Sequence, residues 1–109
     1  MPIETRIERD LKRRTLTALS VYVLDEKNRE LHIRTAKHGP ELVTTARVVT
    51  VDGAFVTFEV YGDFSKNLVR TLDRCTEKNV RAQHERVLAR LDDLVRKVQA
   101  FYAAKNARS

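Results

Sequence analysis

The chain is poor in the residues that cross-link a protein or interrupt its secondary structure. Its 109 residues include one cysteine, two prolines, three glycines and no tryptophan. The single cysteine, Cys75, excludes an intramolecular disulfide and fits a reducing compartment. The longest apolar runs are a few residues, far short of the ~20 that span a bilayer, and we find no signal-peptide pattern. We therefore expect a cytoplasmic protein with no membrane partner.

Positive charge is in excess and is unevenly distributed. The chain has 21 Lys and Arg against 15 Asp and Glu, for a net charge of +6. Residues 66–109 hold eleven basic and five acidic side chains, whereas residues 15–65 hold five basic and seven acidic ones. With 42% hydrophobic residues, the composition is that of a globular protein, and the length predicts a single domain over residues 1–109. An electrostatic partner should meet the C-terminal segment first.

The N-terminal segment has apolar residues at a helical spacing. Ile3, Ile7 and Leu11 recur every four residues between charged ones. Pro2 suits the first turn of a helix, and basic residues suit its last turn. The spacing predicts a short helix over residues 3–13.

The middle of the chain is rich in β-branched and aromatic residues, which favour strands. Gly39–Pro40 and Asp52–Gly53 predict turns, and Asp-Gly is typical of a two-residue type I′ hairpin turn. In the first strand, Val21 and Val23 share one face and Tyr22 lies on the other. Neither face is clearly polar, so we expect both faces to be covered. Short connections favour a four-stranded antiparallel meander over residues 15–24, 29–37, 42–51 and 54–61.

The C-terminal third, from about Ser65 to Ala104, contains no glycine and no proline. Its apolar residues follow a helical period and predict a long amphipathic helix. Leu68 and Leu72 point away from the later apolar stripe, so the helix is either continuous or broken near Thr76–Asn79. A continuous helix would overhang a chain of this size. The stripe therefore either folds back across the sheet as a second helix or pairs with a second copy.

Charges beside the stripe favour pairing between two copies. Glu85 and Asp92 border it on one side and Arg90 and Lys97 on the other, as in helices that pair with their own sequence. The alternative is that these charges are the solvated flanks of a helix packed on its own sheet. In a homodimer, His84 would make association sensitive to pH. The predicted dimer seam consists of Val80, His84, Val87, Leu91, Leu94, Val98 and Phe101.

The same helical region is rich in arginine, whose guanidinium group binds phosphate. Neutralising several phosphates gives strong, salt-dependent binding to nucleic acid. The basic residues are spread around the helix, however, and the sheet is net acidic with few aromatic residues for stacking on bases. The predicted nucleic-acid contacts are Arg81, Arg86, Arg90, Arg96 and Lys97.

Residues that could perform chemistry are scattered. His32, His38 and His84 lie far apart in the chain, and no cysteine stands at a zinc-ligand spacing from them. Cys75 has basic neighbours but no base and orienting group. Isolated glycines form no phosphate-binding loop. We therefore predict no catalytic residue, no metal, no cofactor and no small-molecule substrate, so that the protein is not an enzyme.

These observations together predict an α+β fold: a short N-terminal helix, a four-stranded antiparallel meander and a long C-terminal amphipathic helix. The function that fits them is that of a small, basic, homodimeric binding module in protein–protein association or assembly. The alternative is a nucleic-acid-binding protein that uses its arginine-rich helix.

Overall fold

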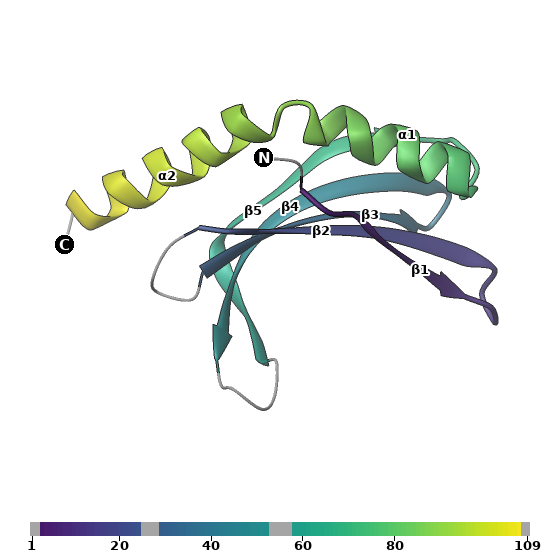
Figure 1. Ribbon diagram of the computed structural model, residues 1–109, viewed down its shortest axis with the longest axis horizontal. Helices are drawn as coiled ribbons and strands as arrows, with labels where there is room; N and C mark the ends of the chain where they lie inside the picture. The colour runs from purple at the N-terminus through teal and green to yellow at the C-terminus, as the bar shows by residue number, and fades with distance from the viewer. Residues whose placement is uncertain (1–2, 25–28, 53–57, 108–109) are drawn as a thin grey trace.

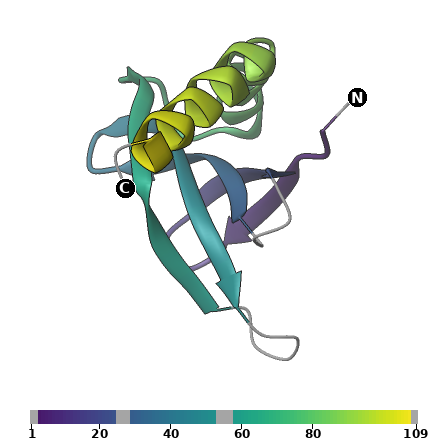
Figure 2. The ribbon, with the colours of Figure 1, turned by 90° about the vertical axis from the view of Figure 1, so that its left-hand side faces the viewer.

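The computed structural model describes residues 3–24, 29–52 and 58–107 and shows an antiparallel sheet with two helices along one of its faces (Figure 1, Figure 2). The predicted α+β class is confirmed. The described strands form one five-stranded sheet in chain order, so strands that follow one another in sequence lie side by side. The elements are β1 (Arg6–Asp10), β2 (Thr15–Val23), β3 (Arg29–His38), β4 (Glu41–Asp52), β5 (Phe58–Thr71), α1 (Glu77–Leu88) and α2 (Leu91–Ala107).

The β3–β4 hairpin has the tight turn that its sequence predicts. His38 pairs with Glu41, which leaves Gly39 and Pro40 as the two turn residues. Gly39 has a φ of +60°, the left-handed conformation that the first position of a type II′ turn requires. Glycine adopts this conformation without strain because it has no Cβ atom. Pro40 then suits the second position, since its ring holds φ near about −65°.

The predicted turn at Asp52–Gly53 lies partly outside the described residues, because these do not include residues 53–57. The pairing on either side of it nevertheless excludes a two-residue turn. Val51 pairs with Glu59, whereas a type I′ turn at Asp52–Gly53 would place it opposite Ala54. The predicted type I′ turn is therefore wrong.

The predicted helix over residues 3–13 is also wrong, because this segment contains the edge strand β1. β1 pairs antiparallel with the first half of β2. Ile3, Thr5 and Ile7 are half-buried while the residues between them are exposed, and Ile7 packs against the core. Apolar residues four apart satisfy a strand as well as a helix when every second position faces inward. Pairing with β2 decided between the two, and the exposed charges suit the edge of a sheet.

The C-terminal third is helical only from Glu77 onward. Residues 65–71, predicted to be helical, belong to β5, which pairs with β4 as far as Thr71 opposite Leu42. Thr76, near the predicted break, is instead the N-cap of α1: its hydroxyl accepts the backbone N–H of Asn79 at 3.2 Å. The helices are separated later, between Leu88 and Leu91. No helix in the described parts of the chain is long and apolar enough to cross a membrane.

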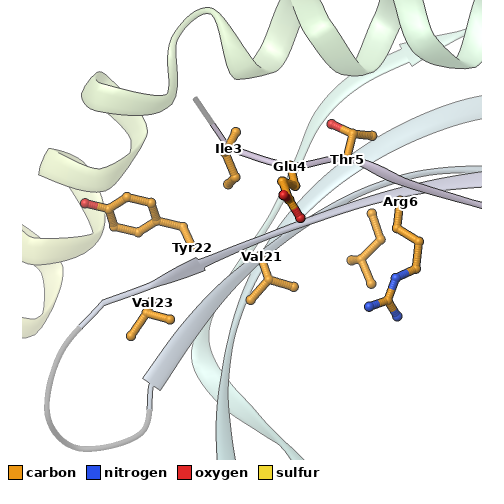
Figure 3. Close-up of a pocket in the computed structure, with 8 residues that line it drawn as sticks. Ile3, Glu4, Thr5, Arg6, Val21, Tyr22 and Val23 are labelled. Atoms are coloured by element: carbon orange, nitrogen blue, oxygen red, sulfur yellow. The ribbon is translucent and has the colours of Figure 1, made fainter. Parts of the chain in front are cut away.

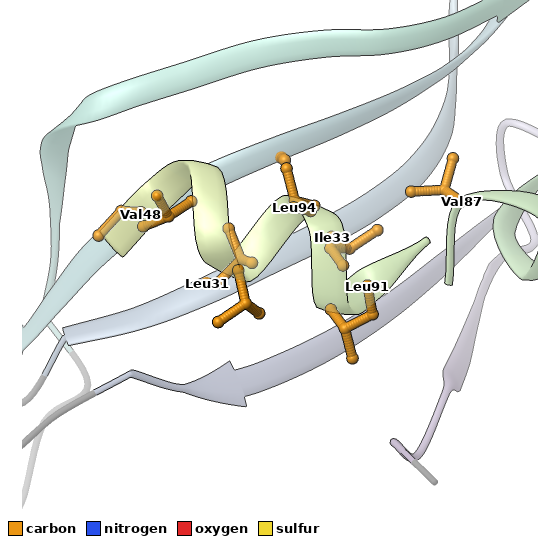
Figure 4. Close-up of a cluster of buried hydrophobic side chains, with 9 residues drawn as sticks. Leu31, Ile33, Val48, Val87, Leu91 and Leu94 are labelled. Atoms are coloured by element: carbon orange, nitrogen blue, oxygen red, sulfur yellow. The ribbon is translucent and has the colours of Figure 1, made fainter. Parts of the chain in front are cut away.

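The core lies between the two helices and one face of the sheet (Figure 4). Each buried aliphatic side chain of this kind stabilises the fold by about 1.5–3 kcal/mol. One cluster lies under α2 and the end of α1 and contains Leu31, Ile33, Ala46, Val48, Val87, Leu91, Leu94, Val95 and Val98. A smaller cluster lies under the start of α1 and contains Leu16, Ala18, Leu42 and Val80.

Candidate functional site: the open end of strand β2

The side chains expected in a dimer seam lie mostly inside the monomer. Phe101 is the exposed member of the set, at 38%, and its ring packs edge-on against Tyr102. Of the two arrangements that the apolar stripe allowed, the structure has the one in which the stripe folds back over its own sheet. The buried members are Val80, His84, Val87, Leu91, Leu94 and Val98.

The basic residues expected to contact nucleic acid are all exposed, four of them on the two helices and Arg90 in the connection between them. Two of them are engaged by acidic neighbours on the same helix: Arg81 lies 3.9 Å from Glu77, and Arg96 forms an ion pair with Asp93. For the other three, no acidic partner is found among the described residues. The surface is therefore mixed in charge. The five basic residues are Arg81, Arg86, Arg90, Arg96 and Lys97.

Strand β2 is paired on one side only over its last residues. β1 pairs with it as far as Leu19, whereas β3 continues to Val23. Along Ser20–Val23, the part of the chain that the structure describes places no strand on the outer side. The last three side chains are large, apolar and exposed: Val21 at 38%, Tyr22 at 36% and Val23 at 66%. The end of β2 thus combines unpaired backbone with exposed apolar surface.

A groove of about 820 Å³ runs along this edge, between residues 3–6 and the end of β2 (Figure 3). We call it the edge groove. A hydrogen bond of 2.9 Å between the hydroxyls of Thr5 and Ser20 ties its N-terminal wall to β2. Val21 projects to one face of the sheet, while Tyr22 projects to the face that carries the helices. An occupant would therefore meet apolar side chains on both faces.

The edge groove differs in charge between its two ends. At one end, Leu19 is paired with Arg6 on one side and with Arg34 on the other, and both arginines are exposed. At the other end, Val23 is paired with Glu30. Residues paired in this way share one face of the sheet. The groove is consequently basic near Leu19 and acidic near Val23.

A chain of buried polar side chains runs from the groove wall into the core beneath α1. Ser20 Oγ lies 2.8 Å from His84 Nε2, and Thr35 Oγ1 lies 2.8 Å from His84 Nδ1. Thr35 is bonded in turn to Thr44 at 2.7 Å, and Thr44 to Gln83 Nε2 at 3.1 Å. We call these five residues the buried polar chain. Among the described residues, every buried side-chain nitrogen and oxygen has a hydrogen-bond partner.

Gln83 determines the direction of these hydrogen bonds. Its Nε2 donates to the backbone carbonyl of Leu42 at 3.0 Å, and a carbonyl can only accept. The amide orientation is therefore unambiguous, and Oε1 accepts the hydroxyl proton of Thr71 at 2.8 Å. The same Nε2 donates to Thr44.

The protonation of His84 follows from this direction. Thr44 accepts from Gln83, so its own proton is available to Thr35, and the proton of Thr35 is then available to His84 Nδ1. In this arrangement His84 is neutral and carries its proton on Nε2, which donates to Ser20. Burial lowers the pKa of His84 from 6.5 to about 4, because a cation loses its hydration in the core. The neutral ring is thus a structural component of the fold.

The contact between Ser20 and His84 has the length found between a nucleophile and its base. Its surroundings do not suit that role, since both side chains are at most 1% exposed. The group on the far side of the imidazole is the hydroxyl of Thr35, whereas a carboxylate is what stabilises an imidazolium in hydrolytic triads. The pair therefore contributes to stability.

The other candidates for chemistry are held in separate places. The Sγ of Cys75 donates to the carbonyl of Leu16 at 3.4 Å and accepts its N–H at 3.3 Å. His32 donates to Glu30 at 3.0 Å, and His38 is exposed beside the β3–β4 turn. Within the described ranges, no group of three or more His, Cys, Asp or Glu side chains is placed to hold a metal ion.

The edge groove was not predicted from the sequence. β2 was expected to be covered on both faces, yet Val21 and Val23 are exposed because they lie on the face of the sheet opposite the two helices. The alternation of Ile3, Thr5 and Ile7 with charged residues was the signal in the sequence that the N-terminal segment is an edge strand. Comparisons of the chain with protein-family models, curated proteins and solved structures found no match.

Proposed function

We propose that this protein is a small non-enzymatic binding module that acts in protein–protein association through the open end of β2. The observation that carries the proposal is the run of three exposed apolar side chains, Val21, Tyr22 and Val23, on a strand whose outer side has no partner among the described strands. Exposed apolar surface of this kind marks interaction sites. Unpaired strand edges are natural templates for another chain, and proteins usually blunt them with charge. β1 has such charges, whereas the end of β2 has valines and a tyrosine.

The proposed module has no catalytic role. Among the described residues, Ser20 and His84 lie at the distance of a nucleophile and its base, but both are at most 1% exposed. The edge groove is lined by aliphatic side chains, Thr5 and Tyr22, together with Glu4 and Arg6, which lie on one wall. Such a surface recognises a ligand by contact area and backbone pairing.

A peptide-binding experiment tests the proposal. A phage-displayed library of random 12-residue peptides is expected to enrich binders on the wild-type protein. Val21→Asp with Val23→Asp should lower the affinity of the enriched peptides at least 100-fold, because two carboxylates would replace the apolar contact and lose hydration on binding. Fluorescence anisotropy with synthetic peptides measures the dissociation constants.

The matched control is Leu72→Asp with Leu11→Asp. Both leucines are exposed, at 78% and 87%, and both lie away from the groove. This variant makes the same chemical change and should retain wild-type affinity. Equal losses in the two variants, or no enrichment on the wild-type protein, would contradict the proposal.

The sequence also predicted that this binding module forms a homodimer. A dimer of this fold would need a surface other than the predicted seam, since most of the seam is buried. Light-scattering mass measured after size exclusion over a hundredfold range of protein concentration distinguishes monomer from dimer. The Val21→Asp, Val23→Asp variant then shows whether a dimer uses the end of β2.

Nucleic-acid binding by the outer side of the helices is the second candidate. Arg86, Arg90 and Lys97 favour it, because all three are exposed and no acidic partner is found for them among the described residues. If the three contact phosphates, log affinity for duplex DNA should fall with log salt at a slope of about −2.7.

Replacing Arg86, Arg90 and Lys97 with glutamate is expected to abolish the binding of a mixed oligonucleotide pool while leaving the fold intact. The same change at Lys12, Arg13 and Arg14, in the β1–β2 connection, produces an equal shift in net charge and should retain most of the binding. Filter binding at 50 and 200 mM salt measures both variants. Equal loss in the two would indicate attraction by net charge alone, and no binding by the wild-type protein would eliminate this candidate.

A further inference from the structure

At the end of β2, the backbone groups on the outer side of the strand could pair with another strand. β3 pairs with β2 through Val23 opposite Glu30, while β1 ends opposite Leu19. Successive backbone groups of a strand point alternately to its two sides. Along Val21–Val23, the inner side of β2 is paired with β3 and the outer side faces the edge groove. A chain lying in the groove would therefore find donors and acceptors spaced for a strand.

The N-terminal segment leaves room for that chain. Residues 3–5, which precede Arg6, are no longer paired with β2 as a strand. The hydroxyl of Thr5 is hydrogen-bonded to that of Ser20, and Ile3 packs against the core under α2. Ile3 and Glu4 then line the far wall of the groove (Figure 3). The groove lies between this wall and the outer side of β2.

The exposed side chains dictate the composition of the occupant. Val21 and Val23 lie on one face of the sheet, two residues apart, and Tyr22 lies on the other. Residues directly opposite each other on paired strands have Cβ atoms about 4.5–5.5 Å apart. An added strand would cover the two valines with apolar side chains at alternate positions.

The charges dictate which end of the occupant is acidic. Arg6 and Arg34 flank Leu19 on the same face as the two valines. A carboxylate at the Leu19 end of the added strand would lie next to Arg6, with Arg34 across β2 on the same face, a favourable charge environment. At the opposite end, Glu30 faces Val23 from β3 and would repel a second carboxylate.

We propose that the edge groove binds an extended peptide segment of a partner protein as a sixth strand beside β2, with apolar residues at alternate positions and an acidic residue at the Leu19 end. The inference rests on the proposed function, because it specifies the partner of the same site. It differs from simple apolar contact in requiring backbone pairing and a defined position for the acidic residue.

N-methylation of the bound peptide tests the backbone pairing. The probes are synthetic peptides with the sequences enriched from the 12-residue library, each methylated at one backbone nitrogen. Methylation at amides that face β2 removes a donor and adds bulk, so every second position should weaken binding at least tenfold. The positions between them should change it less than threefold. A uniform effect, or a repeat of three to four residues, would overturn the strand.

A charge exchange tests the position of the acidic residue. Arg34→Glu is expected to weaken binding of the acidic peptide at least tenfold, and changing the acidic residue of the peptide to lysine should restore it. Lys12→Glu, an equal change in net charge in the exposed β1–β2 connection, should leave binding within threefold of wild type. Loss without restoration would overturn the assigned contact.

The outcomes separate this inference from the proposed function. Selected peptides that bind through Val21 and Val23 without the alternating pattern would overturn the added strand and leave the binding module intact. Failure to enrich any peptide would overturn both. If light scattering shows a dimer that Val21→Asp with Val23→Asp converts to monomer, the occupant is a second copy of this chain and the partner segment is overturned.

Discussion

Replacing His84 with alanine is expected to lower the free energy of unfolding by about 4 kcal/mol. The change removes a ring that is fully buried, and large-to-small substitutions in a core cost about 2–5 kcal/mol. It also deprives the hydroxyls of Ser20 and Thr35 of their ring partner, and a buried polar group left unpaired costs about 1–3 kcal/mol. Domains of this size are stable by about 5–15 kcal/mol, so much of the margin would be lost. Urea unfolding followed by far-ultraviolet circular dichroism measures the difference.

Two further variants show whether the loss comes from the buried polar chain. His38→Ala removes an exposed imidazole beside the β3–β4 turn and should change stability by no more than about 0.5 kcal/mol. His84→Asn retains one donor and one acceptor at the buried position and should lose less than alanine does. A cost below about 1 kcal/mol for His84→Ala would mean that the ring does not support the core.

Lowering the pH from 7 to 4 is expected to cost the fold about 3 kcal/mol through His84 alone. The pKa of the imidazole is 6.5 in the unfolded chain and about 4 in the folded one. Between these pH values the unfolded chain binds a proton that the folded chain does not, so acid favours unfolding. The stability is present in full above pH 6.5 and is lost as the pH falls toward 4, at up to about 1.4 kcal/mol per pH unit.

The contribution of His84 can be isolated by subtraction. Carboxylates also titrate over this range, and they do so equally in wild type and in His84→Asn. The free energy of unfolding at pH 7, 6, 5 and 4 should therefore fall more steeply in wild type than in the variant. Nuclear magnetic resonance of the ring carbons should show no titration of His84 above about pH 5. Parallel losses in the two proteins would contradict a neutral, buried imidazole.

The same residues connect the stability of the core to the edge groove. Ser20 is hydrogen-bonded to His84 and also to Thr5 on the groove wall. A substitution of His84 would remove the hydrogen bond that holds Ser20 from the core side. The shape of the groove therefore depends on a polar contact in the core as well as on the strands that border it.

Short-range patterns were sufficient for part of the fold. Alternation over residues 29–37 predicted β3, because one face of that strand is covered and the other is open. Gly39–Pro40 predicted the turn that follows, because its two residues supply the backbone angles of that turn. The helical stripe from Val80 to Val98 predicted which side chains are buried together. Each of these features was predictable from residues that lie close together in the chain.

The wrong secondary-structure predictions fall in segments whose sequence fits a helix and a strand equally well. Ile3 and Ile7 fit a helix or an inward-facing strand, and the presence of β2 decided between them. Residues 65–71 have no helix breaker, yet β4 pairs with them and makes them a strand. α1 ends at Leu88 and α2 begins at Leu91, although no glycine or proline lies between them to indicate a helix break.

The amino-acid sequence was enough to establish an α+β chain with a helical, basic C-terminal region, since composition and periodicity are local properties. The tertiary structure alone decided where the apolar stripe is buried, how His84 is hydrogen-bonded and which strand edge stays open. These depend on contacts between distant residues, such as Ser20 with His84 and Arg6 with Leu19. The edge groove exists because β1 stops halfway along β2 while β3 continues to its end, a difference in length that only pairing between strands creates.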